Sequence, residues 1–296
     1  DFTNRLKLIA FAVQTGGGVA MTIFAAYSMY HLAQRGSVSG LLTASDPIIK
    51  LRPFRAPHHT ASGIAIIGGG SFPKPGEVSL AHRGVLFLDE FPEFGRAVIE
   101  NLRQPMESGQ VTVARARGSV SFPAKFILVA AMNPCPCGWY GDDKHECSCS
   151  MAAIVRYRQK ISGPIRDRID LFIRVPKITY PELSRKTSQS ETSAMIRSRV
   201  ERARELQLER FQEENKKRPR PIFTNAEMGP KELKSLVPLS DALGQILNNA
   251  EQVYGLTPRS IHRVIKVSRT IADLAGSQEI KEAHLAEALQ YRIANE

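Results

Sequence analysis

The chain has 296 residues, of which 43% are hydrophobic, and this length and apolar content suffice for one large domain or two ordinary ones. Forty lysines and arginines against 29 aspartates and glutamates give a formal net charge of +11, which favours a polyanionic partner, nucleic acid before membrane. All four cysteines lie between Cys135 and Cys149, which excludes the scattered pattern of a secreted disulfide scaffold and fits a reducing cytoplasm.

The first residues imitate a secretory or membrane segment. Residues 8–29 carry almost no charge and follow two basic side chains. Two polar residues and three glycines at 14–18 interrupt this segment in its middle, where a spanning helix would lose most. We therefore expect a strand over 8–13, a glycine turn and a helix over 19–32, without membrane insertion.

A strand, a glycine-rich turn and a helix form the layout of a phosphate-binding loop. In this reading the backbone N–H groups around Gly16, Gly17 and Gly18 face the phosphates of ATP. Val19 and Ala20 follow, where a Lys and a Ser or Thr are expected. The loop therefore lacks the cation for the β- and γ-phosphates and the hydroxyl for Mg²⁺, and the signal is weak by itself.

Residues 52–84 are rich in Gly, Pro, His and Arg, which indicates a functional insertion of loops and a hairpin instead of a core element. Two adjacent histidines without a third partner at ligand spacing are more often loop residues than a metal site. Contact with phosphates is the favoured use of the basic side chains. The candidate DNA-binding residues of this segment are Arg55, His58, His59 and Lys74.

The stretch GVLFLDEFPE at 84–93 places two carboxylates directly after four apolar residues. A continuous apolar run of this length predicts a strand of a parallel sheet that is buried on both faces. Its carboxyl end is where open α/β sheets bind ligands. Asp89 can hold Mg²⁺ on the phosphates, and Glu90 can polarise the attacking water. The alternative is an Asp that only caps the next helix.

A helix and a basic hairpin are predicted next. Apolar residues recur at helical spacing over 96–107, despite Pro105 near the end. Alternating residues at 111–114 and 119–122 then predict a hairpin. Arg115 and Arg117 at its tip are candidate DNA contacts, with a solvated turn as the alternative.

The apolar run 126–132 predicts a second buried strand, which ends at Asn133. An amide at the end of a strand beside the acidic one can hydrogen-bond the attacking water or the γ-phosphate. Asn133 is therefore a candidate member of the nucleotide site.

Cys135 and Cys137 are followed, after nine residues, by Cys147 and Cys149. Two close thiol pairs on a short loop suit a tetrahedral Zn²⁺ site with four thiolates, in which the metal replaces the core that the loop lacks. C-x-C pairs are less diagnostic than C-x₂-C pairs, and His145 could replace one ligand. Reduced thiols and disulfides remain the alternatives.

A helix over 151–160 and a strand over 171–175 are expected to complete a first domain, 1–180. The remainder, 181–296, reads as a helical linker and lid domain, with a basic break at 216–221. Ser240 is a predicted N-cap, Gly255 and Gly276 are predicted C-caps, and Pro258 occupies a first turn. The expected helices are 191–212, 240–254, 258–275 and 277–292.

Six long motifs between residues 52 and 291 carry a resemblance to a known family. They are RPFRAPHHTAS, GGGSFPKPGEVSLAHRGVLFLDEFPEF, LRQPMESGQVTVARA, MNPCPCGWYGD, RYRQKISGPIRDRIDL and HRVIKVSRTIADLAG. In this order they resemble the ComM/YifB family, in the magnesium-chelatase-related group of AAA+ ATPases. The resemblance implies an α/β P-loop nucleotidase core, with a parallel sheet flanked by helices, and an α-helical lid. It also implies a homo-hexameric, ATP-driven branch-migration helicase that acts on single-stranded and branched DNA in natural transformation.

The resemblance also assigns roles to single residues of the nucleotide site. Arg166 stands where the family usually has Leu, so it rivals Arg168 as the finger. The matched residues are Asp89 and Glu90 as the Walker B pair, Asn133 as the γ-phosphate sensor, Arg168 as the arginine finger given to a neighbouring subunit, and Arg259 as the lid arginine.

Departures from the family concentrate before residue 52. The chain begins at Asp1, and the family's N-terminal Lon-protease-like domain is missing, so we expect the chain to be part of something longer. Two other readings stay open. One is a magnesium-chelatase motor subunit, and the other is a DNA-binding subunit whose nucleotide site is degenerate.

Overall fold

The computed structural model describes residues 52–175 and 191–293, apart from 71, 72, 116, 117, 143 and 220. The strand, glycine turn and helix expected before residue 52 lie outside these ranges. Contacts divide the chain between Arg168 and Ile169 into two units. The boundary expected after residue 180 falls outside the described residues. Within the described ranges, no helix has both the length and the apolar character that a membrane span requires.

The first unit is built on a parallel sheet in the order β1 (Phe54–Arg55), β4 (Val85–Leu88), β7 (Ile127–Ala130). Val85 lies opposite Phe54 on one side and Ile127 on the other. Val85, Leu86 and Leu88 are almost fully buried, which confirms the strand predicted from the apolar run. Gly84 must be glycine, because a Cβ atom there would lie 1.9 Å from the carbonyl oxygen of Pro53.

The expectation that 52–84 holds only loops and a hairpin is wrong. This segment contributes β1 to the parallel sheet and two short helices, α3 (Gly63–Ile67) and α4 (Glu77–Leu80). Ile66 and Val78 on these helices are fully buried. The expected hairpin exists in reduced form, as the two-residue pairing of β2 (Gly68–Gly69) with β3 (Lys74–Pro75). An apolar run of four residues is too short for periodicity to separate a helix from a loop insert.

The helix expected over 96–107 is divided into α5 (Arg96–Asn101) and α6 (Arg103–Ser108), after the short 3₁₀ turn η1 (Phe91–Glu93). Pro105 has no N–H to donate to Asn101, so the ladder of hydrogen bonds is interrupted between the two helices. The predicted hairpin is confirmed: β5 (Gln110–Arg115) pairs in antiparallel register with β6 (Gly118–Pro123).

β7 confirms the position of the second predicted strand but not its burial. Ile127 is 42% exposed, because β7 is the edge strand of the sheet formed by the described residues. The chain continues through the cysteine loop into α7 (Met151–Arg158) and α8 (Gly163–Arg166). The strand expected over 171–175 is not formed, and these residues have no regular structure.

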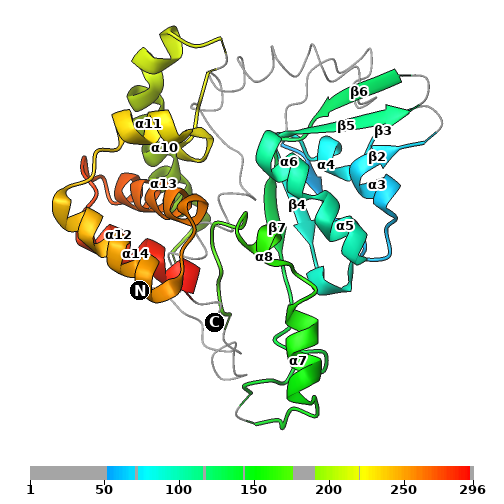
Figure 1. Cartoon of the computed structure of the whole chain (residues 1–296). Helices are drawn as coiled ribbons and strands as arrows, with labels where there is room; N and C mark the ends of the chain where they lie inside the picture. The colour runs from blue at the N-terminus through cyan, green and yellow to red at the C-terminus, as the bar shows by residue number, and fades with distance from the viewer. Residues whose placement is uncertain are drawn as a thin grey trace. The chain divides into compact units, whose positions relative to one another are not determined.

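The second unit is helical (Figure 1). Ser240 accepts a hydrogen bond from the N–H of Leu243 in the first turn of α12, and Gly255 ends α12 in the left-handed conformation, so these two predicted caps are confirmed. Pro258 lies in the first turn of α13 as predicted, after the N-cap Thr257, and Gly276 is left-handed one residue beyond the C-cap Ala275. The helices missing from the sequence prediction are η2 and α11. The full set is α10 (Ser193–Lys216), η2 (Asn225–Glu227), α11 (Pro230–Leu236), α12 (Asp241–Tyr254), α13 (Pro258–Leu274) and α14 (Glu282–Ile293).

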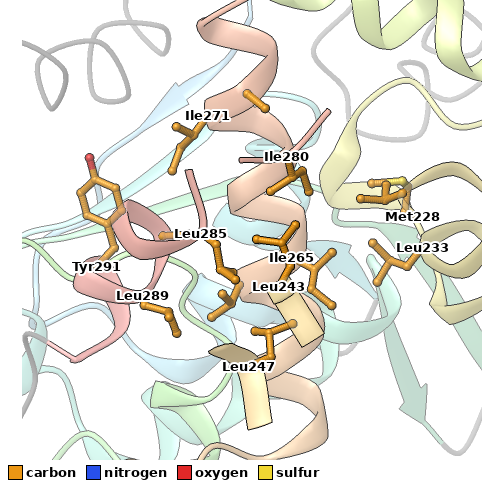
Figure 2. Packing of buried hydrophobic residues seen from close by; sticks show 14 of the residues in the cluster. Met228, Leu233, Leu243, Leu247, Ile265, Ile271, Ile280, Leu285, Leu289 and Tyr291 are labelled. Atoms are coloured by element: carbon orange, nitrogen blue, oxygen red, sulfur yellow. The ribbon is translucent and has the colours of Figure 1, made fainter. Parts of the chain in front are cut away.

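One apolar core holds this unit together, with α13 in its middle (Figure 2). Ile265 and Ile271 of α13 are buried beside Leu285 of α14 and Leu247 of α12. Ile271 and Leu285 are 6% and 0% exposed, so truncating either side chain leaves a cavity that costs about 2–5 kcal/mol. The unit therefore has a core of its own.

A buried polar cluster fixes α13 against α10 and η2. The Asp273 side chain is fully buried and pairs with Arg210 and Arg269. Asn225 donates to its Oδ2 atom at 2.8 Å. The carboxylate thus accepts hydrogen bonds from two guanidinium groups and one amide, which is the condition for burying it without a large loss.

Candidate nucleotide and metal sites

The acidic turn after β4 is the centre of the candidate nucleotide site. Asp89 and Glu90 are both exposed at the carboxyl end of the strand. Glu90 adopts the left-handed conformation, with φ of 50°, and its N–H donates to Asp89 Oδ1 at 2.9 Å. A non-glycine residue in this conformation costs of order 1–3 kcal/mol and is typical of functional sites. The turn therefore presents two exposed carboxylates on a strained backbone.

Packing below this turn explains how its geometry is held. Phe91 and Phe94 are 1% and 3% exposed and anchor η1 in the core. The N–H of Phe91 donates to the carbonyl of Ala131 at 2.9 Å, and the N–H of Ala131 donates to Leu88 at 3.0 Å. Two backbone hydrogen bonds thus hold the strained turn against the residue that follows β7.

Asn133 leaves the same edge of the sheet as the two carboxylates. Leu88 is paired with Ala130, so both chains emerge together at the carboxyl ends of β4 and β7. Asn133 is exposed, and its backbone hydrogen-bonds the phenol of Tyr157 on α7. Burial raises the pKa of Tyr157 above its ordinary value, so this phenol stays a neutral support for the turn.

The two adjacent histidines have different environments. His59 Nδ1 lies 2.9 Å from Glu90 Oε2, and the edge of its ring faces Phe94. His58 is exposed, and its ring centroid lies 4.1 Å from that of His59. The sequence predicts that both residues bind DNA. In the structure, His59 contacts Glu90, the candidate general base. No spacing signal reports this contact, because it joins residues from different elements.

The two candidate finger arginines differ sharply. Arg168 is 8% exposed, donates to the carbonyl of Pro164 at 2.8 Å and forms an ion pair with Glu107 of α6. Arg166 ends α8 and is exposed. The guanidinium of Arg168 is therefore used inside its own unit, while Arg166 has the accessibility that a contact with a neighbouring subunit requires.

The remaining predicted residues are spread over several elements. Arg55 forms a two-pronged pair with Glu77, at 2.5 and 2.7 Å, and the hydrogen bonds to Glu77 raise the pKa of Arg55. This pair joins β1 to α4, so Arg55 serves the fold as well as the surface. Lys74 is exposed in β3, and Arg259 is exposed in the first turn of α13. The glycines 16–18 and Arg117 lie outside the described residues, and Arg115 lies at the end of β5.

The four cysteines meet in one cluster. Cys135 Sγ lies 3.4 Å from Cys137 Sγ and 3.7 Å from Cys147 Sγ, and all four sulfur atoms lie within 4.8 Å of one another. Tetrahedral Zn²⁺ with Zn–S bonds of about 2.3 Å requires sulfur atoms about 3.8 Å apart. The distances fit that ion and are far longer than a disulfide bond of about 2.05 Å.

The electrostatics of the cluster also suit a cation. The backbone N–H of Trp139 donates to Cys137 and, with help from the other thiols, lowers the pKa of Cys137 to about 6. The N–H of Cys149 acts to lower the pKa of Cys147, but burial and the neighbouring sulfurs outweigh it and raise this pKa to about 12. Four thiolates thus repel one another until a cation compensates them. His145 stacks on Trp139 and lies beside Asp142, outside the four-sulfur cluster.

Comparison with known proteins gives two adjoining family matches. The family described as "Magnesium chelatase, subunit ChlI" matches residues 21–183, and the ChlI C-terminal family matches residues 190–292. The first match begins after glycines 16–18, so it does not test whether they form a phosphate-binding loop.

Single relatives agree with these matches. Competence protein ComM of Haemophilus influenzae is 48% identical over 243 residues, which are 82% of this chain and 45% of that protein. The uncharacterized protein YifB of Escherichia coli is 43% identical over 241 residues, 81% of this chain and 45% of that protein. The magnesium-chelatase subunit ChlI of Chlorella vulgaris is 39% identical over 61 residues, 21% of this chain and 17% of that protein. The chain spans less than half the length of the relatives that it matches over most of its own length.

Proposed function

Because the chain belongs to the magnesium-chelatase ChlI family of AAA+ ATPases, we propose that it is the motor region of a homo-hexameric, ATP-driven DNA branch-migration helicase. The observation that carries the proposal is the pair of exposed carboxylates, Asp89 and Glu90, at the carboxyl end of the buried strand β4. The similarity to a competence protein over 82% of this chain supports a role in natural transformation and recombination of incoming single strands.

The carboxylates divide the work of ATP hydrolysis. Asp89 is an exposed oxygen donor of the kind that Mg²⁺ takes, and the ion would neutralise charge on the phosphates. Glu90 accepts a proton from the attacking water, and the Asn133 amide orients that water or the γ-phosphate. Arg166 or Arg168 stabilises the charge in a neighbouring subunit's site, and Arg259 reports the nucleotide state to the lid domain.

DNA is the polyanion that the net charge of +11 accommodates. His58 and Lys74 are exposed, and Arg115 ends β5 of the β5–β6 hairpin. Arg117, which the sequence predicts near the tip of that hairpin, lies outside the described residues. In a ring these elements would contact the phosphate backbone, which gives sequence-tolerant and salt-dependent binding in the cytoplasm.

Zn²⁺ in the four-cysteine cluster has a structural role in this proposal. Its donor set is closed, with four thiolates and no open position for substrate. The ion would fold the loop between β7 and α7, which has few apolar residues of its own.

A second candidate is a DNA-binding subunit without ATP turnover. Val19 and Ala20 favour it, since they replace the cation and the hydroxyl of the phosphate loop. A chelatase motor subunit shares the fold, but the ChlI protein of Chlorella vulgaris matches only 21% of this chain.

The experiment is ATP hydrolysis by the purified chain with and without forked DNA, together with Glu90→Gln. A motor hydrolyses ATP, is stimulated by DNA and loses turnover in Glu90→Gln, while DNA binding remains. Neutralising Arg115 and Arg117 together should lower the salt slope of single-strand binding by about 1.4, or about 0.7 for each lost phosphate contact. DNA binding without any ATP turnover favours the second candidate.

A further inference from the structure

The cysteine loop carries an exposed aromatic stack. Trp139, the single tryptophan of the chain, lies between the two cysteine pairs. Its indole stacks on the imidazole of His145, with ring centroids 4.1 Å apart and planes inclined by 27°. Trp139 is 39% exposed, and the His145 side chain is 53% exposed. Both rings of the stack are therefore accessible to solvent.

The stack is held rigidly by the loop. The N–H of Asp142 donates to the Trp139 carbonyl at 3.0 Å, and Asp142 Oδ1 accepts the N–H of His145 at 2.9 Å. The same carboxylate oxygen lies 3.3 Å from His145 Nδ1 and so orients the ring. The backbone of Trp139 is itself bound to Cys137 in the sulfur cluster. The rings thus lose little conformational entropy when a ligand covers them.

Trp139 is not the aromatic residue that fills the core of this region. Tyr157 of α7 is buried instead, with 5% exposure. An indole that only filled the loop would be covered in the same way, because a large aromatic ring is worth most when it is fully buried. The loop instead presents its largest apolar ring at the surface, next to polar residues.

Charged side chains of both signs lie in the segments that carry the aromatic rings, and the acids Asp142, Asp143 and Glu146 are among them. Lys144 precedes His145 and is exposed, and the guanidinium of Arg158 lies 5.3 Å from the centroid of the Tyr140 ring. Arg156 is exposed on the same helix, α7. Glu146 is exposed as well, whereas Asp142 is occupied by hydrogen bonds from the N–H groups of Lys144 and His145. Rings interleaved with Lys and Arg are the surface type that binds single-stranded nucleic acid.

We propose that Trp139 and His145, with Lys144 and the arginines of α7, form a second nucleic-acid site, in which an unpaired base stacks on Trp139. The ligand class is single-stranded nucleic acid, because only unpaired bases offer their faces to a protein ring. The inference rests on the proposed action on DNA. In Figure 1, α7 and the loop before it project from the first unit at the end away from the β5–β6 hairpin, so this contact is separate from the hairpin.

The test uses the whole zinc-loaded chain and an oligothymidylate strand, with a blunt duplex as the second probe. Because Trp139 is the only tryptophan, all indole emission reports this loop. We expect the strand to quench that emission and the duplex to leave it nearly unchanged. Trp139→Ala should weaken strand binding, measured by anisotropy of a labelled strand, by about tenfold, and Trp139→Phe should retain most of the affinity.

Val155→Ala is the matched control, since it removes an apolar side chain that is 46% exposed on α7 without touching the rings. Its strand affinity should equal that of the parent. Zinc content and thermal unfolding verify that each variant is folded. If Trp139→Ala does not fold, the quenching in the parent and the strand affinity of Trp139→Phe still test whether a base stacks on this ring.

Each contrary outcome has one meaning. Strand binding with unchanged emission, equal quenching by the duplex, or full affinity in folded Trp139→Ala overturns the stacking site and leaves the proposed DNA motor standing. Loss of self-association in Trp139→Ala at unchanged strand affinity assigns the stack to a protein contact instead. Absence of any strand binding by the parent removes the proposed action on DNA, and this inference with it.

Discussion

The imidazole of His59 lies against the carboxylate of Glu90, with 2.9 Å between Nδ1 and Oε2. His59 follows β1, and Glu90 follows β4, its parallel neighbour in the sheet. In this arrangement the candidate general base is engaged by a protein group before water reaches it. The exposed His58, whose ring touches that of His59, connects the contact to the surface proposed for DNA.

Replacing His59 tests whether this contact restrains Glu90. A hydrogen bond of about 1 kcal/mol net occupies the carboxylate most of the time, so His59→Ala should raise kcat without DNA by about fivefold. KM for ATP should not change, since His58 and Phe94, the other residues that the ring contacts, are not proposed to bind ATP. Steady-state kinetics measure both. Glu93→Gln, an exposed carboxylate of the same turn that pairs with Lys160, is the control and should match the parent. A fall in kcat in His59→Ala would mean that the ring orients Glu90 for catalysis.

Replacing Arg166 and replacing Arg168 should have different effects on ATP turnover and on thermal stability. Arg166→Ala should lower ATP turnover by about 10³-fold, because the exposed side chain is proposed to act on a neighbouring subunit. Arg168→Ala should destabilise the first unit by about 1–3 kcal/mol, because it leaves a carbonyl and Glu107 without their partner. Calorimetry and an ATPase assay distinguish the two. A full loss of turnover in Arg168→Ala at unchanged stability would make Arg168 the finger.

The buried cluster around Asp273 should be the most sensitive polar position of the helical unit. Asp273→Ala strands Arg210 and Arg269 without a counter-charge, so we expect a loss of about 3–5 kcal/mol in the free energy of unfolding. Denaturant titration followed by circular dichroism measures it. Glu251→Ala, an exposed acid on α12, should stay within about 0.5 kcal/mol of the parent. Equal effects of the two substitutions would contradict the role of the cluster.

Elemental analysis should find about one Zn²⁺ per chain, as a closed four-thiolate site requires. Cys147→Ser should lose the metal and the order of the loop, because three thiolates leave one position open. His145→Ala should keep the metal, since His145 lies outside the sulfur cluster. A folded, metal-free preparation with four titratable thiols would refute the zinc assignment, and metal loss in His145→Ala would place that ring among the ligands.

Changing the glycine loop tests the second candidate function. Val19→Lys with Ala20→Thr restores the cation and the hydroxyl, so it should tighten ATP binding and raise turnover if glycines 16–18 form the phosphate loop. Calorimetric titration with ATP and Mg²⁺ measures the affinity. The double variant Val19→Ala with Ala20→Ser serves as the control without a new charge. An unchanged affinity in the Lys-Thr variant would place the nucleotide elsewhere.

The sequence by itself determined the elements whose signals are local. The apolar run before Asp89 predicts β4 because a buried parallel strand needs continuous apolar residues. The alternation around Arg115 predicts the hairpin, and Ser240 and Gly255 mark the ends of α12 because caps satisfy backbone groups within one turn. The spacing of the four cysteines likewise predicts a cluster, since a short loop cannot separate them far.

Only the tertiary structure decided the contacts between distant segments. His59 meets Glu90, Arg168 meets Glu107, and Asp273 meets Arg210, each across a separation that no helical or strand period relates. Such contacts depend on the path of the backbone between their partners, so composition and spacing cannot predict them. Burial of side chains also depended on the tertiary structure. The sequence predicts surface loops over residues 52–84, because this segment is rich in Gly and Pro. They contain Ile66 and Val78, which are buried because packing, unlike local propensity, is set by what the rest of the chain leaves uncovered.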